Sequence, residues 1–392
     1  MKKIVLLAFV LVFLSMFGTK LVITVNCSTT HHVHSGESIQ DAIDLAQHGD
    51  TIIVHSGTYY ETVIVDKIVS LIGKDKHNTI IDANGTGSVV SIQANHVTIS
   101  NFTLQNGYVG VYSESSIIDT AISDNVICFN EMGIYFWYCE DNVLSGNTFF
   151  LNNDHGIYLH YSDNNTISGN TFCSTKGSSG IQLHLSNKNL VSSNTILNDN
   201  YGLRLISSDN NKVFHNNFID NTDQVIDNTG EANVWDDGYP SGGNYWSDYT
   251  GVDSYSGLYQ NETDSDGIGD TPYFSDSYPL MKPYILSDEM LVCCYELLTK
   301  YNKLYSELQG NYDALEASYD NLQTDYTIMN SRYNSLNSSY NELTSKHEAI
   351  IGELNYIRNL MYVFIITTLI FIASTAYLAM RRPKAKPKVE TT

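Results

Sequence analysis

Basic residues are scarce in this chain of 392 residues, which contains 21 Lys and Arg against 43 Asp and Glu and carries a net charge of −22. A nucleic-acid-binding protein needs a basic surface to neutralise phosphates, so this deficit argues against that class of function. Proline is also rare, with six residues, whereas 28 Tyr against 14 Phe indicate many half-exposed rings. The composition is not that of a cytosolic metabolic enzyme, although the length suffices for one large or two medium domains.

The two ends of the chain indicate its compartment. A short basic start and the apolar run 4–18 are typical of a secretory signal, so we assign 1–27 as a signal peptide. The uncharged apolar run 360–380 is long enough to span a bilayer, and the basic tail 381–392 follows it directly. The positive-inside rule makes this tail cytoplasmic. The sequence thus predicts a single-pass protein of the cell membrane that faces outward; a buried C-terminal helix is the alternative.

A repeat with a period near 23 residues runs through 95–221. Each copy contains short β-type segments, and none has the length or periodicity of a helical repeat. Such copies describe the coils of a parallel β-helix, in which each coil buries its inward face by stacking on the next, and we predict this fold over 36–225. We expect the repeated Asn to stack in left-handed turns and to bond neighbouring backbone. The repeated residues are Asn101, Asn125, Asn147, Asn170, Asn194 and Asn216, and Gly110, Gly133, Gly156, Gly180 and Gly202.

Alternation after each Gly predicts which side chains face outward. Strand side chains alternate between faces, so the first and third residues after Gly point into the coil and the second and fourth point away. The outward residues are Tyr112, Tyr135, Tyr158, Gln182 and Arg204 in one column and Glu114, Trp137, His160, His184 and Ile206 in the other.

Aromatic rings with a few hydrogen-bonding groups on a rigid sheet suit the flat face of a sugar or a protein partner. Packing between coils without any ligand is the alternative. Our candidate ligand-binding residues are Tyr112, Tyr135, Trp137, Tyr158 and Gln182.

Upstream, 38–46 has the pattern of a short amphipathic helix with Ser38 as its N-cap, and a helix here closes the end of a stack of coils. Together with Gly49-Asp50-Thr51-Ile52 and Gly57-Thr58-Tyr59-Tyr60-Glu61, this region resembles the N-terminal coils of right-handed parallel β-helix proteins. The coil motif N-x-[IV]-x-x-N-x-[FI] is similar to that of the NosD-like "periplasmic copper-binding" family. The segment 233–249 resembles a module of archaeal surface members. The resemblance covers about 36–285 and implies the fold more than an activity.

An enzyme is the second interpretation. The broader β-helix group includes pectin-modifying enzymes, and the resemblance implies paired Asp for hydrolysis or calcium with a basic proton acceptor for elimination. The coils contain only four Lys and Arg from 97 to 222 and none of the GHG, NTD or RIK signatures of pectin hydrolases. The catalytic candidates for a polysaccharide lyase, hydrolase or epimerase are Asp154, His155 and Arg204.

Two kinds of metal site are predicted. His160 and His184 occupy equivalent positions in consecutive coils, where two imidazoles suit copper or zinc, and a copper-handling accessory protein is our third interpretation. Asp264, Asp266 and Asp270 surround two glycines in an acidic module over 226–285, and hard oxygen ligands on such a loop suit calcium. The alternatives are solvated histidines and an acidic turn.

A coiled-coil stalk is predicted over 290–358, because apolar residues recur there at spacings of three and four. One seam holds six consecutive Tyr from Tyr305 to Tyr340, and the other holds mainly Leu. We therefore expect a homo-oligomer that presents the β-helix at the cell surface. Its predicted role is non-catalytic recognition of a cell-envelope polysaccharide or a surface protein, with calcium in the acidic module. The expected glycosylation sites are Asn84, Asn101, Asn164, Asn261 and Asn337.

Overall fold

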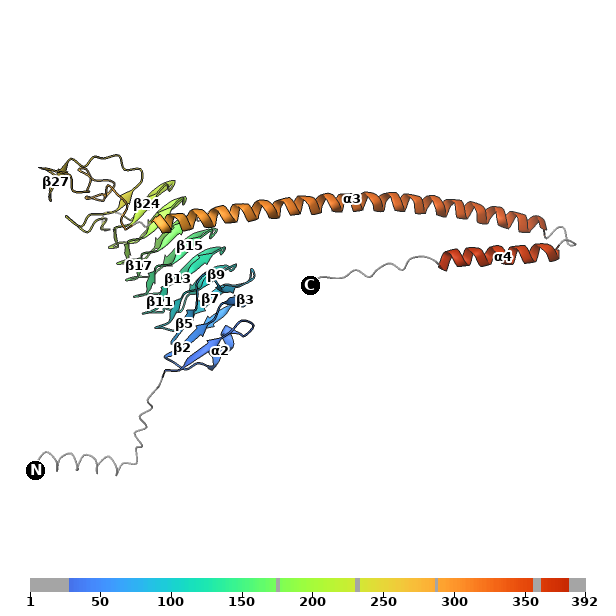
Figure 1. Cartoon of the computed structure of the whole chain (residues 1–392), viewed down its shortest axis with the longest axis horizontal. Coiled ribbons are helices and arrows are strands. Elements are labelled where there is room, and N and C mark those ends of the chain that lie inside the picture. The colour runs from blue at the N-terminus through green and yellow to red at the C-terminus, as the bar shows by residue number, and fades with distance from the viewer. Residues whose placement is uncertain (1–27, 174–176, 230–232, 286–287, 355–360, 381–392) are drawn as a thin grey trace, which may run out of the picture. The chain divides into compact units, whose positions relative to one another are not determined.

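The computed structural model describes residues 28–173, 177–229, 233–285, 288–354 and 361–380, which Figure 1 draws in colour. The predicted signal peptide and basic tail lie outside these residues. The chain divides into two compact units, Met1–Leu298 and Thr299–Thr392. The first unit holds the strands, and the second is helical where it is described.

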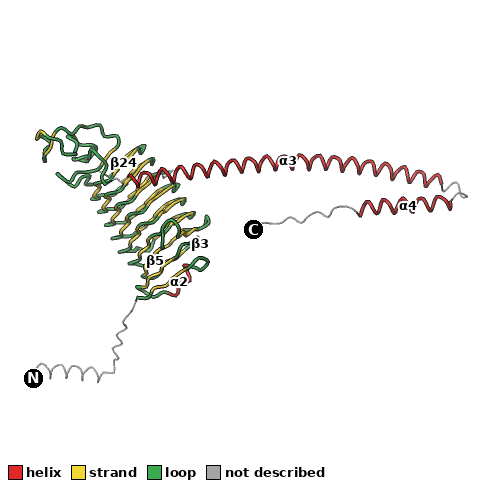
Figure 2. Tube along the Cα trace, in the orientation of Figure 1, coloured by secondary structure: helices red, strands yellow, loops and turns green. Residues whose placement is uncertain are grey.

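Three parallel sheets form a right-handed parallel β-helix of about eight coils, which confirms the predicted fold (Figure 1). Figure 2 shows the strands of successive coils stacked side by side with turns between them. Sheet A consists of β1 (Thr30–Val33), β2 (Asp50–Val54), β5 (Val69–Gly73), β8 (Thr98–Ser100), β11 (Ala121–Ser123), β14 (Val143–Ser145), β17 (Thr166–Ser168), β20 (Leu190–Ser192) and β23 (Lys212–Phe214).

The other two large sheets complete each coil. Sheet B consists of β3 (Gly57–Tyr59), β6 (Thr79–Asp82), β9 (Thr103–Gln105), β12 (Val126–Cys128), β15 (Thr148–Phe150), β18 (Thr171–Cys173), β21 (Thr195–Leu197), β24 (Asn217–Ile219) and β26 (Tyr245–Trp246). Sheet C consists of β4 (Val63–Val65), β7 (Ser88–Ile92), β10 (Val109–Ser113), β13 (Met132–Trp137), β16 (His155–His160), β19 (Ser179–His184), β22 (Tyr201–Ile206) and β25 (Asp223–Asp227). A small antiparallel pair follows, β27 (Tyr255–Ser256) and β28 (Glu262–Thr263).

The core is a continuous column of apolar side chains inside the coils. The first and third residues after each repeated Gly are fully buried, as predicted. Aromatic rings stack through this core: the Phe149 and Phe172 ring centroids lie 4.6 Å apart, as do those of Phe218 and Trp246. Each coil therefore buries its inward face by stacking on its neighbours, so the stability of the fold depends on the contacts between adjacent coils.

Ladders of Asn side chains bond consecutive coils. After the first Asn of a ladder, each Asn accepts on its side-chain oxygen two bonds from the Asn one coil earlier, one from the backbone N–H and one from the amide. Asn170, for example, accepts both bonds from Asn147, at 3.0 and 3.1 Å. The amide nitrogen of Asn170 also donates to the Leu144 carbonyl at 2.8 Å. One long ladder contains Asn125, Asn147, Asn170, Asn194, Asn216 and Asn244, and a second contains Asn142, Asn165, Asn189, Asn211 and Asn233. Asn130 and Asn152 bond in the same way at a third turn.

The left-handed residue of each turn precedes the ladder Asn, which corrects our expectation that the Asn itself has that conformation. Asp124 and Ser193, for example, have φ of 56° and 57°. Asn101, with φ of 62°, occupies this left-handed position and lies outside the ladder, whose place in that coil is taken by Phe102. The separation has a physical reason: one residue turns the chain, and the next points its side chain inward to bond the adjacent coil.

The repeated Gly lets consecutive coils approach each other closely. A Cβ atom at Gly156 would lie 2.5 Å from the Phe172 ring and 2.6 Å from the Gly180 carbonyl oxygen. At Gly133 it would lie 2.4 Å from the Gly156 carbonyl oxygen. The spacing of Gly in the sequence is therefore a packing requirement of the stack.

The N-terminal end of the stack is covered by α2 (Ile39–Leu45). Ser38 caps it as predicted and accepts a bond from the Asp41 N–H at 3.2 Å. Strand β1 precedes the predicted start of the β-helix at residue 36 and pairs with β2, so the fold begins earlier than expected.

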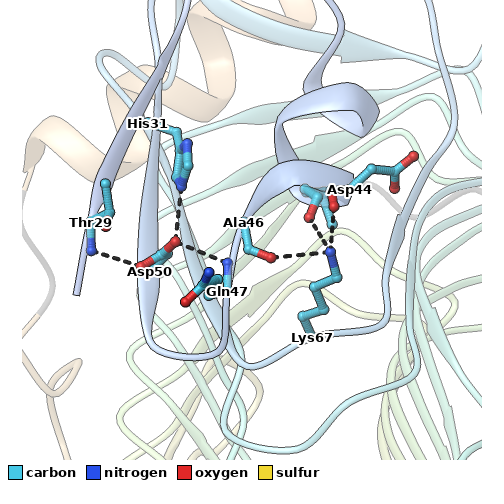
Figure 3. A network of polar contacts seen from close by, with 8 residues as sticks. Thr29, His31, Asp44, Ala46, Gln47, Asp50 and Lys67 are labelled. Atoms are coloured by element: carbon cyan, nitrogen blue, oxygen red, sulfur yellow. Dashed lines mark hydrogen bonds and ion pairs between the residues drawn. The ribbon is translucent and has the colours of Figure 1, made fainter. Parts of the chain in front are cut away.

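A buried carboxylate, Asp50, and a half-buried amine, Lys67, fix the turn after α2, as Figure 3 shows. The Asp50 carboxylate accepts bonds from the Thr29 and Gln47 N–H groups at 2.7 and 2.9 Å and lies 2.9 Å from His31 Nε2. The Gln47 bond, followed by the His31 bond, lowers the pKa of Asp50 to about 2. Lys67 Nζ satisfies three carbonyls at the end of the helix, those of Ile43, Asp44 and Ala46, at 2.9, 2.7 and 3.1 Å.

The last coil extends past the predicted boundary at residue 225. Asn233 and Asn244 continue the two ladders, and β26 pairs with β24. Buried Asp276 then ties the acidic module to this coil, because it accepts bonds from the Asn244 N–H at 2.7 Å and the Trp246 indole at 3.0 Å. The module is thus built onto the end of the stack.

Two helices follow, α3 (Asp288–Leu354) and α4 (Met361–Met380). The seam side chains of α3 from Tyr305 to Leu343 are exposed, from 52% at Tyr333 to 71% at Leu336. The predicted coiled coil therefore stays a prediction. Among the described residues, no helix combines the length and the apolar character that crossing a membrane requires.

Candidate functional site

The predicted outward column of sheet C lies in register across five strands. Tyr112 pairs with Tyr135, Tyr135 with Tyr158, Tyr158 with Gln182, and Gln182 with Arg204. We call these five residues the tyrosine track. The ring centroids of Tyr112 and Tyr135 lie 5.7 Å apart, and those of Tyr135 and Tyr158 lie 5.0 Å apart with nearly parallel planes. The track is a row of three aromatic rings that is followed by an amide and a guanidinium.

A second aromatic column runs beside the track, two residues further along the same strands. The Trp137 ring stacks on His160 with centroids 5.8 Å apart, and His160 stacks on His184 at 4.7 Å. The Tyr158 hydroxyl bonds His184 Nδ1 at 3.2 Å and so joins the two columns. Both columns come from one sheet because every coil contributes the same strand positions.

Two exposed tyrosines border the second column in strained backbone. Tyr138 and Tyr161 have φ of 56° and 50°, a left-handed conformation that is uncommon for bulky residues. Their rings stack with centroids 5.0 Å apart, and their residues are 49% and 40% exposed. The aromatic surface thereby widens beyond the sheet.

Arg204 lies at the end of the track on β22. Its Nη1 donates to the Ser178 hydroxyl at 3.2 Å, and its guanidinium carbon lies 5.0 Å from the Tyr201 ring centroid. Its Nε is buried and has no partner among the described residues, and the same holds for the buried side-chain oxygen of Gln182. A ligand that reaches these two atoms gains bonds that the protein alone leaves unmade.

His155 and Asp154 lie beside this end, so the structure brings all three catalytic candidates to one region. His155 Nε2 lies 3.5 Å from the Asp154 carboxylate, and Nδ1 lies 2.9 Å from the Ser179 hydroxyl. Burial lowers the pKa of His155, opposed by Asp154 and aided by Arg204, so the imidazole is neutral at pH 7. Each ring nitrogen of His155 thus faces one polar side chain, a carboxylate on one side and a hydroxyl on the other.

Burial also shifts the pKa values of the rings on the outward face. It raises the pKa of Tyr135 and of Tyr158, and it lowers the pKa of His160, which His184 lowers further. The neutral forms are therefore the stable ones, and the surface offers rings and hydroxyl groups rather than charge.

The predicted copper or zinc ligands face each other as parallel rings, with an interplanar angle of 2° between His160 and His184. Imidazole lone pairs lie in the ring plane, so one ion between these rings requires a ring to turn. Within the part of the chain that the structure describes, no group of three or more His, Cys, Asp or Glu side chains is arranged to hold a metal ion.

The predicted calcium ligands lie in adjoining loops and accept backbone hydrogen bonds. Asp270 accepts bonds from the Ser254 and Tyr255 N–H groups, and Asp266 accepts one from Ile268. Asp264 bonds the Ser265 N–H at 2.9 Å. Our sequence reasoning missed Asp253, whose carboxylate accepts bonds from the Ser265 hydroxyl and the Asp266 and Gly267 N–H groups at 2.8 to 3.0 Å. Nothing in the residue spacing indicated that contact.

A pocket of about 470 Å³ was also missed. It opens at the turns that join strands of sheet B to strands of sheet C, and its lining mixes amides, rings and one carboxylate. No sequence signal identified it, because the lining comes from turns of four different coils. Its side-chain lining consists of Asn84, Asn106, Tyr108, Phe129, Glu131 and Asn153.

Comparison with known proteins places this geometry in context. The family model described as periplasmic copper-binding protein (NosD) matches residues 43–251. A cell surface glycoprotein of Methanothermus fervidus is 33% identical over 130 residues, which are 32% of this chain and 21% of that protein. The chain thus matches about a fifth of the length of that relative.

Solved structures share only the fold. An alginate lyase from Paenibacillus matches with a TM-score of 0.37 and 13% identity, over 55% of this chain and 97% of that one. The A-module of the mannuronan C-5 epimerase AlgE4 from Azotobacter vinelandii matches with a TM-score of 0.31 and 20% identity, over 46% of this chain and 72% of that one. Since the NosD model covers more than half of its residues, the chain belongs to the family of periplasmic copper-binding proteins (NosD).

Proposed function

We propose that this chain is a non-catalytic cell-surface protein whose β-helix binds polysaccharide along sheet C. The tyrosine track is the observation that carries the proposal. Stacked rings that are held by consecutive strands form a rigid apolar platform, and the hydroxyl, amide and guanidinium groups beside them supply polar contacts. A sugar chain has the same two-sided chemistry, with apolar ring faces and polar edges.

A surface location is supported by the cell surface glycoprotein relative. We propose that the signal peptide and the apolar run 360–380 deliver and anchor the chain, and that the seams of α3 pair with those of further copies. The exposed Leu and Tyr of α3 support this, because 67 residues of isolated helix bury little apolar surface.

We also propose that the acidic module binds calcium through Asp264, Asp266 and Asp270, with Asp253 beside them. The bonds of Asp253 to residues 265–267 and of Asp270 to residues 254 and 255 hold the two loops together, which supports the proposal. Because the described carboxylates do not yet form a metal site, binding must rearrange the loops. Calcium is then expected to raise the melting temperature of the purified chain, and deletion of 263–270 to abolish the increase. A melting curve that is unchanged by chelator contradicts the proposal.

The family description names copper, but the described residues do not fit a copper ion as they stand. His160 and His184 stack face to face, and no third ligand joins them among the described residues. We therefore derive no copper chemistry from this site. Stoichiometric copper that is lost in a His160→Ala/His184→Ala double variant would reverse this conclusion.

The test of polysaccharide binding uses the purified full-length chain with a panel of neutral and acidic polysaccharides. Retention is measured together with the release of fragments. Tyr135→Ala and Trp137→Ala are each expected to weaken retention about fivefold, since a lost ring contact is worth about 1 kcal/mol. Tyr60→Ala, a ring that is 74% exposed and lies off the track, is the matched control.

Each outcome of this panel is decisive. Retention without fragments, reduced by Tyr135→Ala and Trp137→Ala but not by Tyr60→Ala, supports a binding protein. Released fragments that disappear in Asp154→Asn or Arg204→Gln variants make the chain an enzyme. A panel with no retained polysaccharide overturns the proposed function.

A further inference from the structure

Arg204 is the only Lys or Arg in any strand of sheet C. It belongs to a chain with a net charge of −22, yet no carboxylate of the described residues lies within 4.0 Å of its guanidinium. The neighbouring Asp154 carboxylate contacts His155 instead. A half-buried arginine without an ion pair, at the end of an aromatic platform, needs an explanation in terms of what it binds.

The guanidinium keeps one edge for a ligand. The Ser178 hydroxyl takes Nη1, which leaves Nε and Nη2 on the opposite edge without an acceptor from the described residues. Two parallel N–H groups on one edge match the two oxygens of a carboxylate, and such bidentate pairs are the strong form of charge-assisted hydrogen bond. Lysine or an amide does not offer this geometry.

Gln182 supplies the complementary group. The residue is 6% exposed, and its side-chain oxygen is buried and has no partner. That oxygen accepts only from a donor such as a hydroxyl group. Gln182 pairs in register with Tyr158 on one side and with Arg204 on the other. Along the track, an aromatic ring is therefore followed by an oxygen that accepts from a hydroxyl group and then by a guanidinium that can bind a carboxylate.

We infer that this end of the track binds an acidic sugar, with the carboxylate on the Nε–Nη2 edge of Arg204 and a hydroxyl on Gln182. The inference rests on the proposed function and names the class of its ligand. Because the two unpartnered atoms are shielded from solvent, the Arg204 side chain turns outward when the sugar binds, a rotamer change of the kind common at interfaces. The neutral His155 beside it adds no competing charge.

The test measures binding of the immobilised full-length chain to a galacturonate hexasaccharide and to its methyl ester, which keeps the sugar rings and removes the charge. Measurements at 0.15 M salt screen the long-range repulsion between the acidic protein and the ligand. The acidic form is expected to bind at least about tenfold more tightly than the ester, and Arg204→Gln is expected to remove this preference. Arg204→Lys keeps the positive charge but loses the two parallel N–H groups, so this variant is expected to retain only part of the preference for the acidic form.

The control variant is Lys212→Gln, which removes the same charge from β23 of sheet A, away from the track. Equal melting temperatures establish that each variant is folded. If the acid and the ester bind equally well and Arg204→Gln changes neither affinity, the acidic-sugar inference is wrong, while the proposed binding of polysaccharide still stands. A loss of preference in the Lys212→Gln variant also overturns it, because general charge is then responsible. If neither hexasaccharide binds, the proposed function fails with it.

Discussion

At the scale of single residues, a glycine and an asparagine at fixed places in each coil decide how the coils stack. The glycine removes a side chain where the next carbonyl and an aromatic ring approach, and the asparagine bonds both neighbouring coils at once. Both act through van der Waals contact and hydrogen bonds inside the core, where errors are costly.

Gly156→Ala is expected to lower the free energy of unfolding by about 1–3 kcal/mol, because the added methyl group overlaps the Phe172 ring and the Gly180 carbonyl. Denaturant unfolding of the full-length chain, followed by far-UV circular dichroism, measures the change. Thr166→Ala at a half-buried position of sheet A is the control and is expected to cost less. Equal stability of Gly156→Ala and the wild type would mean that the coils tolerate wider spacing.

Asn170→Ala is expected to lower the free energy of unfolding by about 3 kcal/mol or more. The substitution leaves the Asn147 N–H, the Asn147 amide and the Leu144 carbonyl buried without hydrogen-bond partners. The exposed Asn153 provides the matched substitution, Asn153→Ala, which breaks only one weak bond to Glu131 at 3.3 Å. The same unfolding measurement compares them. If both variants lose equal stability, the ladder does not contribute as a network.

The sequence predicted inward and outward side chains well, because the strand period of two is a local property. It placed Tyr135 and His160 on the outward face and Ile157 inside, as observed. It misplaced Asn101, since Asn also occurs at the left-handed position before the ladder Asn, and only three-dimensional bonding separates the two positions. Contacts between distant irregular loops, such as that of Asp253 with 265–267, have no periodic signal at all.

At the scale of elements, the short helix α2 closes one end of the stack through polar contacts as well as apolar ones. Ile39 and Ile43 are buried, while Lys67 and Asp50 satisfy the helix end and the following turn. A seven-residue helix has little stability of its own, so these tertiary bonds hold it in place.

Asp50 makes this closure sensitive to acid. Its pKa in the folded chain is about 2 against an ordinary 3.8, so its contribution to stability is present above pH 3.8 and is lost as the pH falls toward 2. Unfolding free energies from pH 2 to 7 are expected to decline less at low pH in Asp50→Asn, which starts from a lower value at pH 7. The exposed Asp66→Asn serves as the control. Parallel pH profiles for Asp50→Asn and the wild type would contradict the prediction.

The seams of α3 are the second feature at this scale. Leu322→Asp is expected to shift the chain from oligomer toward monomer, since a buried seam leucine is worth about 3 kcal/mol per chain. Ser331→Asp adds the same charge at a position outside both seams. Sedimentation equilibrium of the purified chain measures the mass, and a wild-type chain that is already monomeric at micromolar concentration would rule out the stalk pairing.

At the scale of the whole molecule, the β-helix is a scaffold whose outward side chains are free to vary while its inward ones are not. The tyrosine track uses that freedom on one sheet, and sheets A and B carry no comparable column of stacked outward rings among their described strands. Membership of the NosD family fixes the scaffold, whereas under the proposed function the track residues decide what this chain binds.

Because every coil bonds only the coils before and after it, one repeat is a self-contained genetic unit. Duplication of a single repeat within the gene would insert one more rung into each ladder and one more outward position into the track, without a change anywhere else in the protein. The length of the ligand segment that such a surface can hold is therefore open to evolution in discrete steps. Loss of one repeat would shorten the track by one position, again without a change in the other coils.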